Sequence, residues 1–374
     1  MTLLQTVMTV YKRKTSCDNP LLRKSSCLKI PKQKGERVLS LARKHKIING
    51  NLAIQRDHQF IYVPILKESI DDLSALNKQA SNAEFCEHLF PEKEKRKSSL
   101  GEQLEHDLPP PLLANLPHAM DFIGSIAIIE IPSELEPYSK LVGKAVLKLH
   151  KNIRTVMAKA GAISGTYRLR DFTVIAGESK TETLHKENGC KYYVDIAKAY
   201  FSPRLSSEHA RISSLIKEGE TIVDMFAGVG PFAVQIAKNH KDVAVYAIDV
   251  NPDAVKYLAR NTRLNGVEER VHAVLGDARQ VVHEKLSGIA DRVIMNLPER
   301  AIGYIDIACE ALKPQGGVLY FYSFATTAAP IENVRECFIR SVAKSGRKVV
   351  CVSSSRVRET APFESQVVLE AEIR

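Results

Sequence analysis

The chain has 374 residues, 44% of them hydrophobic, which is enough for about two to three domains with sizeable cores. It contains no run of about 18 apolar residues and no signal-peptide pattern, so we expect neither a membrane span nor secretion. Its seven cysteines are dispersed, without a Cys-x-x-Cys pair or a Cys/His cluster, which predicts reduced thiols in the cytoplasm and no bound metal.

The formal net charge of +10 is concentrated at the N-terminus. Residues 1–50 contain twelve Lys or Arg and two acidic residues, so the rest of the chain is balanced. A basic end on a neutral chain favours contact with nucleic acid, because phosphate contacts supply affinity that does not depend on sequence. A solvated tail and an organelle-targeting peptide are the alternatives.

Changes in composition divide the chain into five segments. Residues 1–25 are expected to form a basic extension, residues 26–66 a small α/β module, and residues 67–111 a charged linker or mobile loop. A middle α/β module is predicted over residues 112–199, and a larger α/β domain over residues 200–374.

The two smaller modules show mixed patterns. In the first, a helix is predicted near residues 34–46, followed by a hairpin of residues 52–55 and 60–64. The middle module is predicted to contain strands at 123–131, 167–172 and 192–196, a helix at 141–160 and a turn at 185–189.

A strand–turn–helix–strand pattern at residues 221–252 is the most informative part of the chain. One apolar run ends at Asp224, a small-residue turn around Gly228 follows, and the next apolar run ends at Asp249. A glycine turn lets a ligand approach the backbone, and an acid after the next strand can bind both ribose hydroxyls. The unit is therefore predicted to hold an adenosine. There is no Lys-Ser/Thr pair after the turn, which argues against a triphosphate-binding loop.

Apolar runs and helical stretches alternate through the rest of this domain. The predicted strands are 221–224, 244–249, 271–275, 291–295, 317–324, 348–353 and 366–372. A helix is expected after each of the first five, and the last two are expected to form an antiparallel hairpin. This order predicts a parallel sheet with ligands at the carboxyl ends of its strands, where Asp224, Asp249, Asp277 and Asn296 fall.

The Asn296-Leu297-Pro298 segment indicates the chemistry. It is similar to the Asn/Asp-Pro-Pro-Tyr motif of enzymes that methylate nitrogen on planar groups, in which an amide and a backbone carbonyl hold the edge of a base. An isolated Asn-x-Pro is more simply a helix N-cap. At the end of the fourth strand we favour base binding, and one residue can do both.

Four segments together resemble one known family. Three of them are the run from Tyr200 to Arg211, the His-Lys-Glu-Asn-Gly turn, and the Asp-Met-Phe-Ala-Gly-Val-Gly-Pro-Phe run, which is similar to motif I of the class I methyltransferases. With Asn-Leu-Pro they resemble the archaeal and eukaryotic tRNA (guanine-37-N1)-methyltransferase family over roughly residues 27–374.

The resemblance implies a fold and an activity. The fold would be a class I, Rossmann-like, seven-stranded methyltransferase domain with two smaller N-terminal α/β modules. The activity would be transfer of methyl from S-adenosylmethionine to N1 of guanosine 37 in tRNA. The implied partner is the tRNA anticodon stem-loop and elbow, and we expect a cytoplasmic monomer.

The resemblance also implies residue roles. Arg168, with Arg170 as the alternative register, would bind guanine O6. Glu208 would be the general base that removes the N1 proton. Asn296 and Pro298 would position the guanine. The implied cofactor contacts are Tyr200, Phe201, Asp224, Phe226, Gly228, Asp249, Val250, Asp277, Ala278 and Asn296. Guanine N1 carries a proton, so a carboxylate that removes it and a cation on O6 fit the reaction. In isolation, Glu208 would be read as a helix-terminal carboxylate and Arg168 as a surface charge.

Two related activities stay open. A sister family transfers an aminocarboxypropyl group in wyosine biosynthesis, and some archaeal members methylate the tricyclic wyosine precursor at carbon 7. We expect glutamate after the second strand in the sister family, so Asp249 favours methyl transfer. Outside enzymes, the alternative is a tRNA-binding protein with an inactive methyltransferase domain, and the presence of the candidate acids, arginine and asparagine argues against it.

Overall fold

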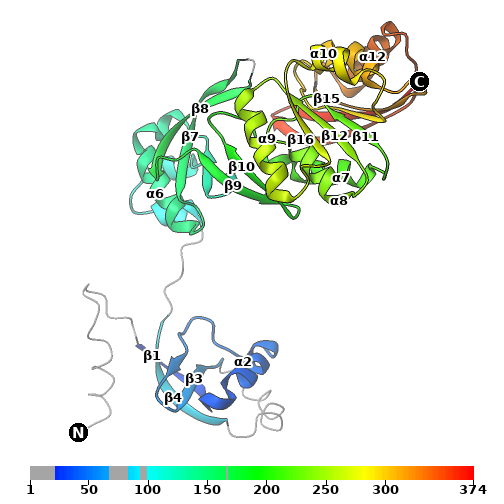
Figure 1. Ribbon diagram of the computed structural model, residues 1–374. Coiled ribbons are helices and arrows are strands. Elements are labelled where there is room, and N and C mark those ends of the chain that lie inside the picture. The colour runs from blue at the N-terminus through cyan, green and yellow to red at the C-terminus, as the bar shows by residue number, and fades with distance from the viewer. Residues whose placement is uncertain (1–21, 67–82, 93–98, 166) are drawn as a thin grey trace. The chain divides into compact units, whose positions relative to one another are not determined.

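The computed structural model describes residues 22–66, 83–92, 99–165 and 167–374. The chain forms two compact units, Met1–Lys97 and Ser98–Arg374 (Figure 1). Among the helices of the described residues, none is long and apolar enough to cross a membrane.

In its described residues the N-terminal unit contains a four-stranded antiparallel sheet, a short 3-10 helix and the α-helix α2. Its elements are β1 (Leu22–Pro31), a short 3-10 helix (Lys32–Lys34), α2 (Gly35–Lys44), β2 (Gln55–Arg56), β3 (Phe60–Pro64) and β4 (Glu84–Pro91), in the sheet order β2-β3-β1-β4. Val38 and Ala42 lie one turn apart on the buried face of α2 and pack with Leu28, Ile30 and Val63 of the sheet.

Two predicted boundaries in this unit are wrong. Residues 84–91 were expected in a charged linker, but they form β4, which pairs with β1 along its length. The predicted basic extension likewise overlaps β1, which begins at Leu22. An edge strand needs few buried side chains, and in β4 Phe90 is buried while most of the others are not, so its composition is that of a linker. Residues 1–21, 67–82 and 93–98 lie outside the described residues.

The first part of the C-terminal unit carries its own sheet. It contains α4 (Leu100–Leu104), α5 (Pro110–Ala114), β5 (Met120–Ile123), β6 (Ile126–Ile129), a 3-10 helix (Ser133–Tyr138), α6 (Ser139–Leu149), β7 (Thr155–Ser164) and β8 (Leu169–Gly177), with the sheet order β5-β6-β7-β8. A separate hairpin of β9 (Glu182–Glu187) and β10 (Cys190–Asp195) follows.

Several predicted elements of this region are corrected by the structure. In the apolar run 123–131 only residues 126–129 form a strand, β6, while Ile123 ends β5, because Gly124 adopts a φ of +54° and the chain reverses there. The predicted helix 141–160 ends at Leu149, and β7 begins at Thr155, with Val156 and Met157 buried in the sheet. The predicted turn 185–189 is narrower, because His185 still belongs to β9.

The remaining residues form the seven-stranded sheet that was predicted. Its elements are α7 (Ser206–Leu215), β11 (Thr221–Asp224), α8 (Pro231–Asn239), β12 (Ala244–Asp249), α9 (Pro252–Asn265), β13 (Val271–Leu275), α10 (Ala278–Val281) with a π-helical turn (Val282–Leu286), β14 (Arg292–Met295), a 3-10 turn (Ala301–Tyr304), α11 (Ile305–Ala311), β15 (Gly317–Thr326), α12 (Ile331–Lys344), β16 (Val349–Ala361) and β17 (Glu364–Ile373).

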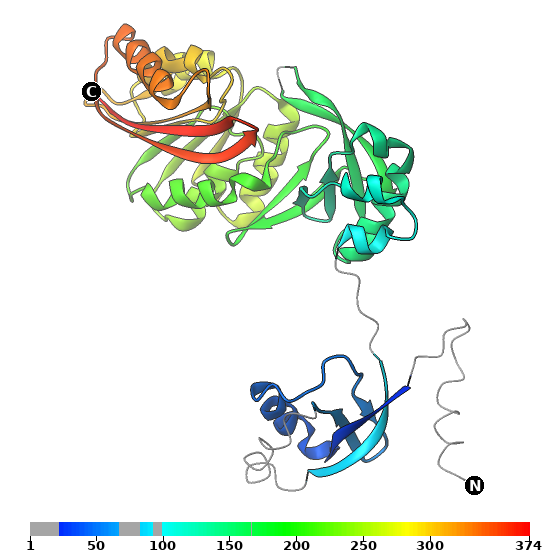
Figure 2. The same cartoon turned by 180° about the vertical axis from the view of Figure 1, so that it is seen from behind.

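The strand order is β13-β12-β11-β14-β15-β17-β16. The first five strands are parallel, and β17 runs antiparallel to both of its neighbours. Figure 2 shows the β16–β17 pair in red, and it confirms the predicted C-terminal hairpin.

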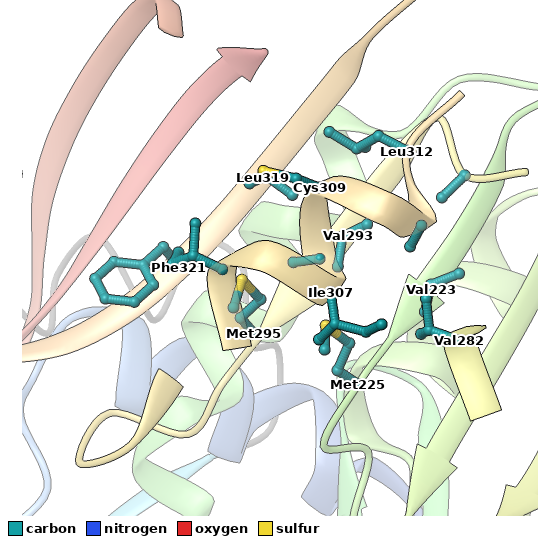
Figure 3. Packing of buried hydrophobic residues seen from close by; sticks show 14 of the residues in the cluster. Val223, Met225, Val282, Val293, Met295, Ile307, Cys309, Leu312, Leu319 and Phe321 are labelled. Atoms are coloured by element: carbon teal, nitrogen blue, oxygen red, sulfur yellow. The ribbon is translucent and has the colours of Figure 1, made fainter. Parts of the chain in front are cut away.

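Helices cover both faces of this sheet, with α7 and α8 on one side and α10 and α12 on the other (Figure 1). Successive strand residues therefore enter different cores. Val293 lies in the same core as Ile307 and Cys309 of α11 (Figure 3), whereas Ile294 lies in the core formed with the side chains of α7 to α9. Strands buried on both faces read as continuous apolar runs, which is why the sequence located them well.

Candidate active site

A hollow of about 140 Å³ opens at the carboxyl ends of the parallel strands. The residues that line it follow four neighbouring strands: Phe226 and Gly228 come after β11, Asp249 ends β12, Asp277 follows β13, and Asn296 follows β14. Parallel strands that end at one edge thus bring together residues that are far apart in the chain.

The turn between β11 and α8 depends on glycine. Gly228 has a φ of +56° and Gly230 a φ of +89°, conformations that other residues rarely adopt. A Cβ atom on Gly230 would also collide with the Leu258 side chain of α9. The Gly228 N–H donates a 2.7 Å hydrogen bond to Asp249 Oδ2, so the turn is tied to the end of the next strand.

The Asp249 carboxylate is fixed at the edge of the hollow. Its Oδ2 accepts from Gly228, and its Oδ1 accepts from the Asn251 N–H at 2.8 Å. Burial raises its pKa, and the backbone hydrogen bonds oppose that shift. Carboxylate oxygens have further lone pairs, so Asp249 can still accept hydrogen bonds from hydroxyl groups of a ligand.

Asp224 lies behind this hollow and does not line it. The side chain is fully buried, and its Oδ1 accepts a 3.4 Å hydrogen bond from the Phe226 N–H. Burial, together with the nearby negative charge of Asp249, raises the pKa of Asp224 to about 7. Within the described residues its Oδ2 has no hydrogen-bond partner.

A second hollow of about 450 Å³ adjoins the first and shares Arg168, Tyr200 and Glu299 with it. Its other lining residues include a set of cations, namely Lys159, Arg170, Arg204 and Arg358. Two of these cations are paired with carboxylates, Arg204 with Asp121 and Lys159 with Glu130. Arg358 donates instead to the neutral side chains of Gln366 and Ser202. The lining of the second hollow also includes four carboxylates, Asp121, Glu299, Glu359 and Glu364, so its five cations exceed its acids by one.

Arg168 lies where the two hollows meet. Its Nη2 donates to Glu299 Oε1 at 3.2 Å, and its guanidinium carbon is 5.1 Å from the centre of the Tyr200 ring. Its φ of +55° is uncommon for a residue other than glycine, and such strain is often found at functional sites. Arg170, the alternative register, lines the second hollow but not the first.

Asn296 is held in place by the C-terminal hairpin. Its Oδ1 accepts a 3.1 Å hydrogen bond from Nε2 of the buried Gln366 on β17. Asn296 and Leu297 both line the first hollow, and Pro298 lines neither of the two. The side chain that the sequence placed at the end of the fourth strand is thus oriented toward the ligand region.

Glu208 is not brought to either hollow. It lies in the first turn of α7 and is 6% exposed. Arg211 donates to both of its oxygens at 2.8 Å, and the Tyr322 hydroxyl of β15 donates to Oε1 at 2.6 Å. These contacts give the carboxylate a structural role between α7 and the sheet, and its assignment as the general base stays a prediction.

Most of the residues predicted from the sequence line the first hollow. These are Arg168, Tyr200, Phe226, Gly228, Asp249, Val250, Asp277, Ala278 and Asn296. Phe201 lines the second hollow instead. In the described part of the chain, no group of three or more His, Cys, Asp or Glu side chains is arranged to hold a metal ion.

Sequence reasoning missed other lining residues, notably Asn251, Gly276, Glu299 and Tyr304. Asn251 had a signal, because Asn-Pro after a strand is a helix start, and its side chain does cap α9. Tyr304 had none: it comes from the 3-10 turn before α11 and packs edge-to-face on Phe226, with ring centres 5.1 Å apart.

The sheet order, the glycine turn after its first strand and the hollow at the strand ends define a class I methyltransferase domain. Three family models match in succession: the tRNA methyltransferase 5 N-terminal domain at residues 27–73, the TYW2 N-terminal domain at 100–181, and the TRM5/TYW2 methyltransferase domain at 183–350. The chain belongs to the TRM5/TYW2 methyltransferase family.

Individual relatives agree with this assignment. The tRNA (guanine(37)-N(1))-methyltransferase Trm5b of Pyrococcus abyssi is 36% identical over 347 residues, which are 92% of this chain and 97% of the relative. The structure of the complex of aTrm5 and tRNALeu matches with a TM-score of 0.70 and 33% identity, over 93% of this chain and 99% of the other. TYW2 of P. horikoshii in complex with MeSAdo matches with a TM-score of 0.63 and 30% identity, over 73% of this chain and 97% of its own.

Proposed function

We propose that this chain transfers the methyl group of S-adenosylmethionine to N1 of guanosine 37 in tRNA. The observation that carries the proposal is the pair of adjoining hollows, one suited to an adenosine and one lined by cations, with Arg168 at their junction. A relative that carries this activity in its name is similar over 92% of the chain.

The first hollow fits the methyl donor. Asp249, held by two backbone N–H groups, would bind the ribose hydroxyls, and Asp277 would bind the exocyclic amine of adenine. Val250, Ala278 and Leu297 offer apolar surface to the adenine ring. Bound there, S-adenosylmethionine supplies an electrophilic methyl group on its sulfonium.

The residues at the junction suit guanine. When N1 loses its proton, negative charge spreads onto O6, and the Arg168 guanidinium can stabilise it in a site partly closed to water. The Asn296 amide, fixed by Gln366, and the backbone near Pro298 would hold the edge of the base. The reaction also needs a base for the N1 proton, and the family resemblance implies Glu208, in the first turn of α7, for this role.

The N-terminal unit supports a second contact with the tRNA. It contains a hollow of about 500 Å³ whose charged lining residues are three cations, Lys32, Arg43 and Arg56, and one acid, Glu36, and phosphate groups bind where cations are in excess. We assign this surface to the tRNA elbow and the basic hollow of the C-terminal unit to the anticodon stem-loop. The monomeric state and the cytoplasmic location predicted from the sequence belong to the same proposal.

A second candidate function is aminocarboxypropyl transfer, because residues 100–181 match the TYW2 N-terminal domain. The TYW2 structure, however, is matched over 97% of its own length but covers only 73% of this chain. The part of this chain that it does not match is about as long as the N-terminal unit. The Trm5b relative spans nearly the whole chain, which favours N1 methylation.

Nucleoside mass spectrometry tests the proposal. Purified protein, S-adenosylmethionine and an unmodified tRNA transcript should yield 1-methylguanosine at position 37, and a transcript with adenosine there should yield none. Arg168→Ala should slow single-turnover methylation, whereas Arg335→Ala, an exposed cation on α12, should not. An aminocarboxypropyl product, or no modified nucleoside, would contradict the proposal.

A further inference from the structure

Arg358 and Gln366 lie opposite each other on the C-terminal hairpin, beside the ligand region. They are paired across β16 and β17, and the register of β16 shifts between Arg356 and Arg358. Such a bulge adds one residue to a strand and redirects the side chains next to it. After the shift, Arg358 lines the second hollow, whereas Arg356, two residues earlier, lines neither of the two.

A chain of hydrogen bonds runs from Arg358 to Asn296. Arg358 Nε donates to Gln366 Oε1 at 2.8 Å, and Gln366 Nε2 donates to Asn296 Oδ1 at 3.1 Å. The guanidinium is also anchored to the segment before α7, because Nη1 donates to Ser202 Oγ at 2.8 Å and Nη2 to the Tyr200 hydroxyl at 3.4 Å. Gln366 is only 1% exposed, so water does not compete for the bonds that it makes.

The direction of this chain is set by its first member. A guanidinium carries donors and no acceptor, so the Gln366 amide has to turn its oxygen toward Arg358. The Gln366 nitrogen then faces Asn296, which has to answer with its own oxygen. Among the described residues, none forms a hydrogen bond with Asn296 Nδ2, so this donor stays free for a ligand. Arg358 thus decides which way round the Asn296 amide stands.

A reversed Asn296 amide would meet the target base differently. Its oxygen and nitrogen would exchange places, so that an acceptor would face the group that a donor faces now. From this geometry, and resting on the proposed N1 methylation, we infer that Arg358 and Gln366 are positioning residues that hold the Asn296 amide in the one orientation that pairs with guanosine 37. Gln366 acts through Asn296 and Arg358 acts through Gln366, so neither needs to contact the reacting atoms.

The test is single-turnover methylation of an unmodified tRNA transcript by the full-length protein. Gln366→Glu keeps the size of the side chain and an acceptor for Arg358, but its carboxylate has no donor for Asn296 Oδ1. Asn296 then has to turn its amide. The rate at saturating tRNA should fall by about 10–10²-fold, because small displacements at a reacting centre are costly. The tRNA affinity and the melting temperature should stay close to those of the wild type.

Arg358 offers a pair of variants that separates charge and bulk from direction. Arg358→Lys keeps a side chain that can only donate to Gln366 Oε1 and should retain most of the rate. Arg358→Met removes that donor and should slow the reaction as Gln366→Glu does. Arg356→Met is the matched control: it removes an exposed cation of the same strand that pairs with Glu359, and it should behave as the wild type.

The outcomes distinguish the inference from the proposed function. A wild-type rate in either Gln366→Glu or Arg358→Met would overturn the inference, and 1-methylguanosine formed by the wild type would leave the proposed function standing. A loss in Arg358→Lys as large as that in Arg358→Met would also overturn it, because the direction of the chain would then not be what matters. So would a loss of rate explained by weaker tRNA binding or by a lower melting temperature. If the wild type itself forms no 1-methylguanosine, the proposed function fails and the inference falls with it.

Discussion

Asp224→Asn is expected to change how the stability of the protein depends on pH. The Asp224 carboxyl is fully buried at the end of β11, and burial together with the charge of Asp249 raises its pKa from 3.8 to about 7. The folded state therefore keeps this proton over a pH range in which the unfolded chain has lost it.

The sign follows from proton linkage. Between the unfolded value of 3.8 and about 7, the folded state binds more protons, so the free energy of unfolding decreases as pH rises through that window. The stabilising contribution is complete below the unfolded pKa and disappears above the folded one. A shift of about three units corresponds to roughly 4 kcal/mol. Asparagine is neutral at every pH, so the variant lacks this dependence.

Urea unfolding of both proteins between about pH 5 and pH 8, without cofactor, measures the effect. From the lower to the upper end of that range, the unfolding free energy of the wild type should fall by roughly 3 kcal/mol relative to that of Asp224→Asn. Asp107→Asn, an exposed acid of the same unit, is the control and should show no such trend. Parallel pH curves for the wild type and Asp224→Asn would refute the reasoning, because they would show that the buried carboxyl does not take up a proton.

Two further predictions concern ligands. Asp249→Ala should weaken S-adenosylmethionine binding by about 1.5–3 kcal/mol, since the variant cannot form the charge-assisted hydrogen bond to the ribose, and calorimetry that finds equal affinity in the folded variant would exclude the ribose role. A chain that begins at Ser98 lacks the whole N-terminal unit but keeps every residue that lines the first hollow. The shortened protein should bind the cofactor normally and tRNA more weakly. The slope of log binding constant for tRNA against log salt concentration should be shallower by roughly 0.7–0.9 for each phosphate group that it no longer binds. Equal slopes for the two proteins in filter binding would contradict the proposed binding of the elbow.

The sequence located the methyltransferase sheet because its strands are buried on both faces and separated by helices. Apolar runs, small-residue turns and acids at strand ends are local signals, so Asp249, Asp277 and Asn296 could be assigned to one edge of a parallel sheet. Local signals failed at β4 and β7. The edge strand β4 is too polar to be distinguished from a linker. β7 follows α6 after only a short turn, and the predicted helix was extended into it.

The tertiary structure decided which charged groups meet. Glu208 looked available in the sequence, but Tyr322, which is far away in the chain, covers it, and Arg211 one turn later in α7 neutralises it. Arg168 lies in the turn before β8 and Glu299 in the turn after β14, and their pairing arises from the packing of the middle region against the methyltransferase domain. Pattern and composition thus determined the strands and the edge where a ligand binds, because these depend on neighbouring residues. The environment of each carboxylate depends on contacts across the fold, and no local pattern encodes those.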